Sequence, residues 1–206
     1  MKSMKTLVAV ALLLNASLLL AGPRIQHWQT ENGARVYFVH SPELPMIDLR
    51  VIYDAGSARD GERPGLAALT NSLLDEGTPT LNANELAETF EGVGAQYGAS
   101  SLRDMAVTSL RSLTEAKAMN TALQTFAAVL ATPTFPEKSF QRNRKAMLIG
   151  LQQEKQSPGA IASKAFYRAI YGSHPYASHS DGTEASLEAV TRDEVKAFHK
   201  DFYTAR

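Results

Sequence analysis

Residues 65–78 read GLAALTNSLLDEGT, and this stretch of the sequence decides the fold. Leu66, Leu69 and Leu73 recur at intervals of three and four residues, the spacing of one face of an α-helix. Glycine ends many helices because it readily adopts the left-handed conformation, so Gly77 fits a C-terminal cap. The stretch therefore predicts an amphipathic helix that starts near residue 66 and ends before residue 77.

Extended segments precede this helix. Residues 34–40 are rich in β-branched and aromatic side chains, and the Asn-Gly pair at 32–33 predicts a tight turn before them. Residues 25–29 lie on the other side of that turn and complete a hairpin. Apolar and polar residues alternate over 46–55, which predicts a half-buried strand. A polar, glycine-bearing loop over 56–64 then leads into the helix.

The remainder of the chain predicts two more strands and then mostly helices. Asn82 or Asn84 can cap the next helix, and Thr114 is a suitable N-cap for a later one. We expect strands over 96–101 and 104–110 and helices over 115–130, 136–156, 158–171, 184–189 and 191–203. Early strands joined by hairpins, followed by helices, indicate an α+β fold with an antiparallel sheet and helices packed on one face.

The composition describes one ordinary globular domain. The chain has 206 residues, of which 44% are hydrophobic and 20% are charged. Its formal net charge is +0, so no basic field points to a nucleic-acid partner. It contains no cysteine, which excludes disulfides and thiolate metal sites.

The N-terminus predicts a secretory signal peptide. Lys2 and Lys5 precede an apolar run over 6–22 that ends in small residues, so we expect residues 1–21 to be removed. The alternative is an uncleaved membrane anchor, but the run is short for a spanning helix and two polar residues interrupt it. We therefore expect a periplasmic protein of the bacterial envelope, with no stable transmembrane segment after cleavage.

The stretch at 65–78 resembles the active-site helix of the pitrilysin/insulinase-type zinc peptidases, which include the mitochondrial processing peptidases. Their pattern there is approximately G-L-A-H-F-L-E-H-M-x-F-x-G-T. The similarity extends, in order, to 54–60 (DAGSARD), 98–104 (GASSLRD), 135–140 (FPEKSF), 174–176 (HPY), 182–184 (GTE) and 198–203 (FHKDFY). The resemblance implies that residues 22–206 form the N-terminal, processing-peptidase-like domain, truncated before its final strands and a second half.

The resemblance also implies that the family's zinc site is degenerate here. Its H-x-x-E-H box supplies two histidine ligands and a glutamate base, and the matching residues are Ala68, Asn71 and Ser72. The family's third ligand, a later glutamate, falls at Gly150. We call these four, three ligand positions and the base position Asn71, the vacated ligand positions. They predict no zinc, no other cofactor and no catalytic residue, since Asn71 cannot act as a base and Ser72 has no histidine within one helical turn.

Other polar residues favour structural roles over catalytic ones. His174 and His179 allow a surface metal site, but their spacing in a loop fits no regular ligand geometry, and we favour a loop-positioning role. Asp75 and Glu76 are neighbours at a helix end and should point in different directions, so a paired acid/base site is not expected. His199 is expected on a solvated helix face.

In the family resembled, substrate peptides add a strand to the sheet of the zinc domain. The matching strand carries Gly98, Ala99, Ser100 and Ser101, which could keep this ability through main-chain hydrogen bonds. The alternative is an edge that neighbouring structure protects.

The favoured function is therefore a non-catalytic, substrate-binding subunit of an envelope peptidase, paired with a zinc-bearing sister and acting on peptide or unfolded protein. The first alternative is a peptide-binding or structural envelope protein that has no catalytic partner. The second, and less favoured, is an active zinc endopeptidase that uses an unrecognised site.

Overall fold

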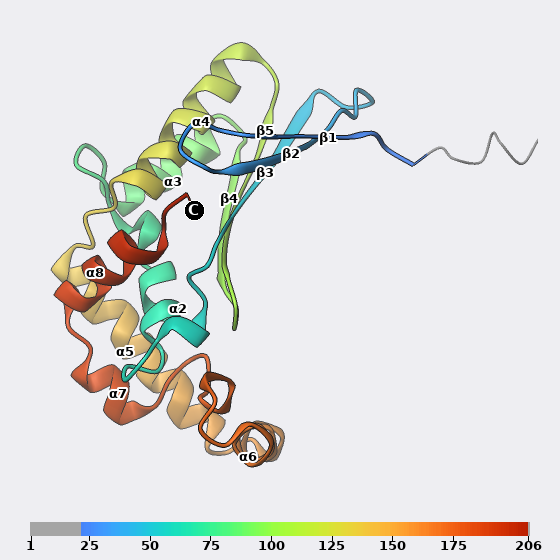
Figure 1. Cartoon of the computed structure of the whole chain (residues 1–206). Coiled ribbons are helices and arrows are strands. Elements are labelled where there is room, and N and C mark those ends of the chain that lie inside the picture. Colours follow the sequence, from blue (N-terminus) through green and yellow to red (C-terminus); the bar gives the residue numbers. More distant parts are fainter. Residues whose placement is uncertain (1–21, 206) are drawn as a thin grey trace, which may run out of the picture. The chain divides into compact units, whose positions relative to one another are not determined.

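The computed structural model describes residues 22–205 and divides them into two units, 22–44 and 45–205 (Figure 1). The predicted signal peptide, 1–21, lies outside the described residues. Each unit is presented by itself. Among the described residues, no helix combines the length and the apolar composition that crossing a bilayer requires.

The first unit is the predicted hairpin. Strand β1 (Ile25–Gln29) pairs antiparallel with β2 (Arg35–Val39). The turn between them is closed by a hydrogen bond from the Thr30 N–H to the Ala34 carbonyl, and Gly33 has φ +93°. A side chain is strained at this φ, which explains why glycine follows Asn32 in the turn.

The second unit is built on a three-stranded antiparallel sheet. Strands β3 (Met46–Tyr53), β4 (Gln96–Ser101) and β5 (Ala106–Leu113) lie in the order β3-β5-β4. Exposed and half-buried residues alternate along β3, as the sequence predicted. Strand β5 starts two residues later than expected, because residues 102–105 form the tight connection from β4. The α+β prediction is confirmed.

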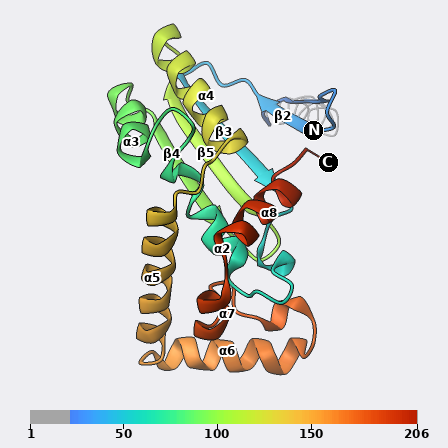
Figure 2. The same ribbon diagram turned by 90° about the vertical axis from the view of Figure 1, so that its left-hand side faces the viewer.

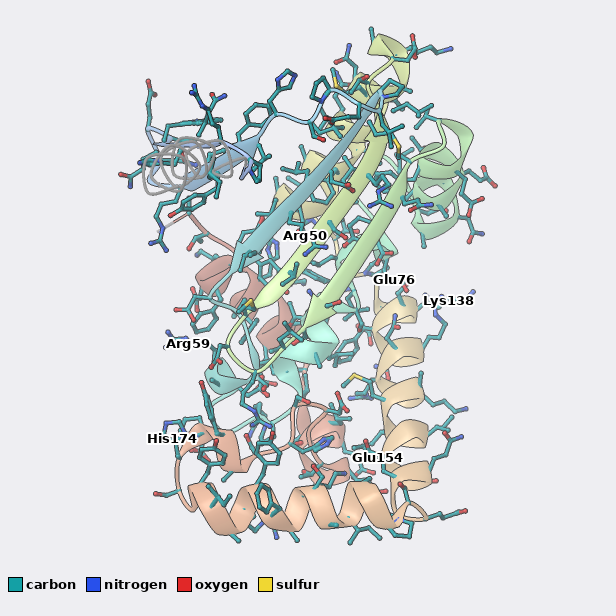
Figure 3. The ribbon with its side chains drawn as sticks, turned by 90° about the vertical axis from the view of Figure 1, so that its right-hand side faces the viewer. Arg50, Arg59, Glu76, Lys138, Glu154 and His174 are labelled. Atoms are coloured by element: carbon teal, nitrogen blue, oxygen red, sulfur yellow. The ribbon has the colours of Figure 1, made fainter. Side chains whose placement is uncertain are left out.

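Helices cover one face of this sheet, as Figure 1 shows for α2, α3, α4 and α8, so the predicted packing on one face is confirmed. Within residues 45–205 the opposite face carries no helix, and the side chain of Arg50 projects from it (Figure 3). The α-helices are α2 (Leu66–Asn71), α3 (Ala83–Gly92), α4 (Ala116–Ala131), α5 (Glu137–Glu154), α6 (Pro158–Tyr171), α7 (Glu184–Ala189) and α8 (Arg192–Phe202). The described residues also include three short 3-10 helices, η2 (Ser57–Arg59), η3 (Leu74–Glu76) and η4 (Pro175–Ala177).

The core lies between the sheet and these helices. The leucines of residues 65–78 point into it, and Leu69, Leu73 and Leu74 are fully buried. They meet Leu110 of β5 and Val195 of α8, which are also buried. A fully buried leucine contributes about 1.5–3 kcal/mol through the hydrophobic effect. The apolar pattern that predicted the helix is thus the pattern that packs it.

Two predicted helix ends differ from the structure. The helix over 65–78 breaks after Asn71 and continues as η3, and Gly77 is extended instead of left-handed. Glycine is needed at 77 because a Cβ would lie 2.9 Å from the Thr134 hydroxyl. Thr114 does not cap α4; Glu115 does, and its side chain accepts a hydrogen bond from the Ala118 N–H.

Helices α5, α6 and α7 form the far end of this unit. In Figure 2, α6 runs across the end of α5, and α7 lies inside the angle between them. Asn82, one of the two predicted caps, starts α3 through a capping box, and a second capping box at Thr191 starts α8. The loop between η4 and α7 returns toward the start of α2, where Gly182 lies against Pro64.

Candidate functional site

The start of α2 is fixed by a buried carboxyl group. Asp60 Oδ2 accepts a hydrogen bond from the Gly65 N–H at 2.8 Å, and Oδ1 accepts one from the Ala67 N–H at 2.7 Å. These N–H groups would otherwise lack partners at the helix start. Burial raises the pKa of Asp60 to about 7, against the lowering effect of the two hydrogen bonds.

A close backbone contact holds the loop before α7 against the same helix start. Gly182 has φ +81°, and a Cβ there would lie 2.2 Å from the Pro64 carbonyl oxygen. Ser186 Oγ donates a hydrogen bond to that same oxygen at 2.6 Å. Only glycine fits such an approach. The contact brings the loop residue Asp181 beside α2.

The structure brings three of the vacated ligand positions to one recess. Ala68, Asn71 and Ser72 line a recess of about 410 Å³, and the edge-strand residues Gly98, Ala99, Ser100 and Ser101 line it too. Helix α2 supplies one wall and strand β4 another. Residues 30 positions apart in sequence therefore share one site, with Asp75, Tyr97 and Asp181 completing its lining.

The polar groups on α2 already have partners within the protein. Asn71 is buried, and its Nδ2 donates a hydrogen bond to the Tyr203 hydroxyl at 3.2 Å. Ser72 Oγ donates to the Leu69 carbonyl at 2.9 Å. Burial raises the pKa of the Tyr203 phenol, so it stays neutral. Tyr203 follows directly after the end of α8, and the sequence pattern did not predict its contact with Asn71.

Gly150 lies in a neighbouring recess. It lines a space of about 480 Å³ together with Glu154 and Asp181, and a Cβ at Gly150 would meet no atom within 4 Å. Asp181 borders both recesses. The fourth vacated ligand position therefore has room for a larger side chain but carries none.

The residues at the vacated ligand positions do not fit zinc. The ion takes histidine nitrogen, cysteine sulfur or carboxylate oxygen. The four positions offer a methyl group, an amide, a hydroxyl and a hydrogen. The amide and the hydroxyl are also engaged in the hydrogen bonds described above. We therefore derive no metal-dependent step at this site.

The two neighbouring carboxyl groups have separate environments. Asp75 lines the recess, and its pKa is raised by burial and by the adjacent Glu76. Glu76 faces α5, where it pairs with Arg142 and accepts a hydrogen bond from Asn143 Nδ2 at 3.0 Å. Burial works against ionisation of Glu76, but these partners outweigh it and lower its pKa. The two carboxyl groups point apart and form no acid/base pair.

A tyrosine in the recess wall has an unused hydroxyl group. The Tyr97 ring packs between Phe90 and Phe126, with centroids 5.6 and 6.1 Å away. Within residues 45–205, its buried hydroxyl has no hydrogen-bond partner, and burial raises its pKa. A buried polar group without a partner is costly.

The three histidines singled out in the sequence have separate positions. His174 caps η4, since its Nδ1 accepts a hydrogen bond from the Tyr176 N–H at 3.2 Å. His179 lies with Asp181 and Glu154, which sequence spacing did not reveal. The predicted solvated position of His199 is wrong: its Nε2 lies 2.9 Å from the Leu130 carbonyl, and its ring stacks on Tyr203. Burial lowers the His199 pKa.

The family model described as Insulinase (Peptidase family M16) matches residues 35–184. The chain belongs to this insulinase family. A crystal structure described as a peptidase M16 inactive domain from Pseudomonas fluorescens is 46% identical, with a TM-score of 0.84, and the match covers 85% of this chain and 43% of that one. The predicted family is thus confirmed.

Two curated insulinase-family relatives are more distant. An uncharacterized zinc protease from Bacillus subtilis is 24% identical over 87% of this chain and 44% of its own length. A non-peptidase homologue from Helicobacter pylori is 26% identical over 91% of this chain and 43% of its own length. The chain spans less than half the length of these relatives. Both peptidase and non-peptidase descriptions therefore occur among proteins that resemble it.

Proposed function

We propose that this insulinase-family chain is a non-catalytic subunit that binds extended peptide along β4 and acts beside a zinc-bearing sister peptidase. One observation carries the proposal: the recess that joins β4 to α2 contains no zinc ligand at Ala68, Asn71 or Ser72. The family's peptide-binding strand is retained beside positions that have lost its chemistry. The crystal structure described as an inactive domain supports a non-catalytic role by similarity.

Strand β4 offers a backbone that a peptide can extend. It lies at one edge of the sheet order β3-β5-β4, so one side of its main chain has no strand beside it in this sheet. Main-chain hydrogen bonds to an edge strand give affinity without requiring a particular peptide sequence. This suits an unfolded protein or a peptide as the ligand.

The recess beside that edge adds side-chain selectivity. The Tyr97 side chain lines the recess, but its hydroxyl group is buried and out of reach of a peptide. Asp75 supplies an acidic group in the same recess. We infer a preference for extended segments that place a polar or basic side chain toward α2.

The partner and the location form part of the same proposal. Smaller members of the insulinase family work as pairs, in which one subunit carries zinc and the other shapes the chamber and binds substrate. A subunit without zinc ligands can contribute to proteolysis when a zinc-bearing sister supplies the nucleophile that zinc generates from water. The predicted signal peptide supports a periplasmic location for this chain, and the proposed sister would have to reach the same compartment.

Peptide binding is tested by neighbouring proline substitutions in β4. Successive residues of a strand direct their N–H groups to opposite sides. One of the two variants Ala99→Pro and Ser100→Pro therefore removes an N–H that points away from the sheet. The other variant removes an N–H that faces β5. We expect the full chain to bind fluorescein-labelled casein, an unfolded protein, in an anisotropy titration.

The outward proline variant should weaken that binding at least about tenfold while its circular dichroism stays unchanged. Tyr97→Phe, which removes only a buried hydroxyl without a partner, should leave casein binding unchanged and serves as a control. Equal binding by the wild type and both proline variants, with the fold intact, would exclude strand addition at β4.

The accessory role is tested by affinity purification from the envelope of the source cells. Recovery of an H-x-x-E-H family member, with peptidase activity that a chelator abolishes, would support the pairing. Recovery of the chain alone, still able to bind casein, would favour a peptide-binding protein without a catalytic partner. Hydrolysis by the purified chain alone would overturn the non-catalytic assignment.

A further inference from the structure

We propose that Glu154, His179 and Asp181 form a site for a divalent transition-metal ion, separate from the vacated ligand positions. One ligand atom from each residue lies within 4.8 Å of the other two. His179 Nδ1 and Asp181 Oδ2 are 3.8 Å apart. Nδ1 also accepts a hydrogen bond from the Asp181 N–H at 3.3 Å, which an ion on Nδ1 would displace. An ion about 2.1 Å from each ligand needs only small side-chain rotations to be shared by all three.

The three residues come from two segments that other contacts already hold together. Glu154 is the last residue of α5 and is labelled in Figure 3 near the turn into α6. His179 and Asp181 lie in the loop before α7, which the Gly182 contact holds at the start of α2. Arg103 Nη1 also donates a hydrogen bond to the Ser178 carbonyl at 3.1 Å. The loop is thus positioned without help from an ion.

The donor set and its surroundings suit a cation. Two carboxylates and one imidazole are the ligands of borderline metals such as Zn²⁺ and Mn²⁺. Glu154 and His179 are half-buried, while Asp181 is exposed. The recess of about 480 Å³ beside Glu154 leaves room for water to complete the coordination. Ca²⁺, which takes six or more oxygen ligands, fits less well.

Lys164 is the counter-ion of Glu154 in the structure. Its Nζ contacts the Glu154 carboxylate, so an ion must displace it. The lysine is on α6 and its side chain is one-third exposed, which lets the ammonium group turn to solvent. The charge of the three ligands with Lys164 is −1 when His179 is neutral, and removing the lysine charge makes it −2. Loss of Lys164 should therefore strengthen metal binding.

This site differs from the family's zinc site in both residues and position. Glu154 lies one helical turn after Gly150, and both line the same recess. Because Asp181 also borders the peptide recess, the bound ion would lie beside that recess. It would join the end of α5 to the loop before α7. Its expected effect is to stabilise that loop, not to supply a catalytic water.

Zinc binding to the full chain tests the site directly. The chain is stripped of metal with a chelator, and zinc chloride is titrated in a calorimeter, with manganese and calcium chlorides for comparison. We expect one ion per chain, with zinc tightest and calcium weakest. Glu154→Gln and Asp181→Asn should each weaken zinc binding at least about tenfold. Lys164→Met should strengthen it.

His174→Gln is the matched control, because His174 lies in the same region but outside the three-residue cluster. Its zinc affinity should equal that of the wild type, whereas His179→Gln should lose affinity. Circular dichroism and a rise of Tm with zinc, absent in Glu154→Gln, separate loss of ligand from loss of fold. No zinc binding by the folded wild type, or equal affinity in Glu154→Gln, overturns the proposal. Casein binding without metal would leave the proposed function intact.

Discussion

Replacement of Asp60 provides a quantitative test of how the candidate site is held in place. Asp60 is buried, and it accepts the hydrogen bonds that start α2. Its pKa is raised by burial from 3.8 to about 7. Between these values the folded state holds a proton that the unfolded chain has released. Raising the pH removes that proton and therefore destabilises the fold.

The size of the effect follows from the two pKa values. Each unit of pKa difference corresponds to about 1.4 kcal/mol, so between about pH 5 and pH 8 the wild type should lose about 2.5 kcal/mol through this group. Asp60→Asn and Asp60→Ala cannot ionise and should lack this contribution. The stability difference between the wild type and either variant should therefore shrink by about 2.5 kcal/mol over that range.

Urea unfolding followed by circular dichroism at several pH values measures these free energies. Comparing each variant with the wild type cancels the titration of the five histidines. Asp60→Ala should lie about 1–3 kcal/mol below Asp60→Asn at every pH, since the amide keeps one acceptor for the buried N–H groups. A difference that stays constant, or that grows toward pH 8, would show that the two hydrogen bonds keep Asp60 ionised and would refute the reasoning.

Two further single substitutions and one multiple variant test the contacts around the recess. Gly182→Ala should cost at least about 2 kcal/mol in urea unfolding, because its Cβ would clash with the Pro64 carbonyl at positive φ, whereas Gly159→Ala in open space on α6 should be neutral or slightly stabilising. Tyr203→Phe removes the partner of Asn71 and should cost about 1–3 kcal/mol by the same assay. Placing the family's two histidines and two glutamates at the vacated ligand positions should create chelator-sensitive binding of about one zinc per chain, measured in the Glu154→Gln background; no binding by a folded variant would mean that those positions are misassigned.

The local elements could be predicted because their signals lie within a few residues. The Asn-Gly pair predicted the hairpin, and the expected cap at Asn82 or Asn84 predicted the start of α3 to within two residues. Gly77 was predicted for the wrong reason, since close packing on Thr134 requires it and its backbone is extended. A sequence pattern shows that glycine is present but not which neighbour excludes a side chain.

The site could be predicted only where a family pattern marked it. Ala68 and Ser72 stood out because histidines were expected there, and the structure places them beside the strand at 98–101. Tyr203 carried no such mark, although it is the partner of Asn71. The cluster around His179 was missed for the same reason, since Glu154 comes from another element. Contacts over such separations depend on the tertiary fold.

The hydrogen bond between Asn71 and Tyr203 spans 132 residues, and Arg63 bonds to Glu194 across 131. The wall of the recess therefore depends on α8, which leaves the ribosome after all the other described elements of this unit. Contacts of such high separation form late in folding, after the local hairpins and helices. A nascent chain that lacked α8 would expose the apolar face of α2. The part of the molecule that gives the site its shape is thus also the part in which an interrupted chain would be most prone to aggregate.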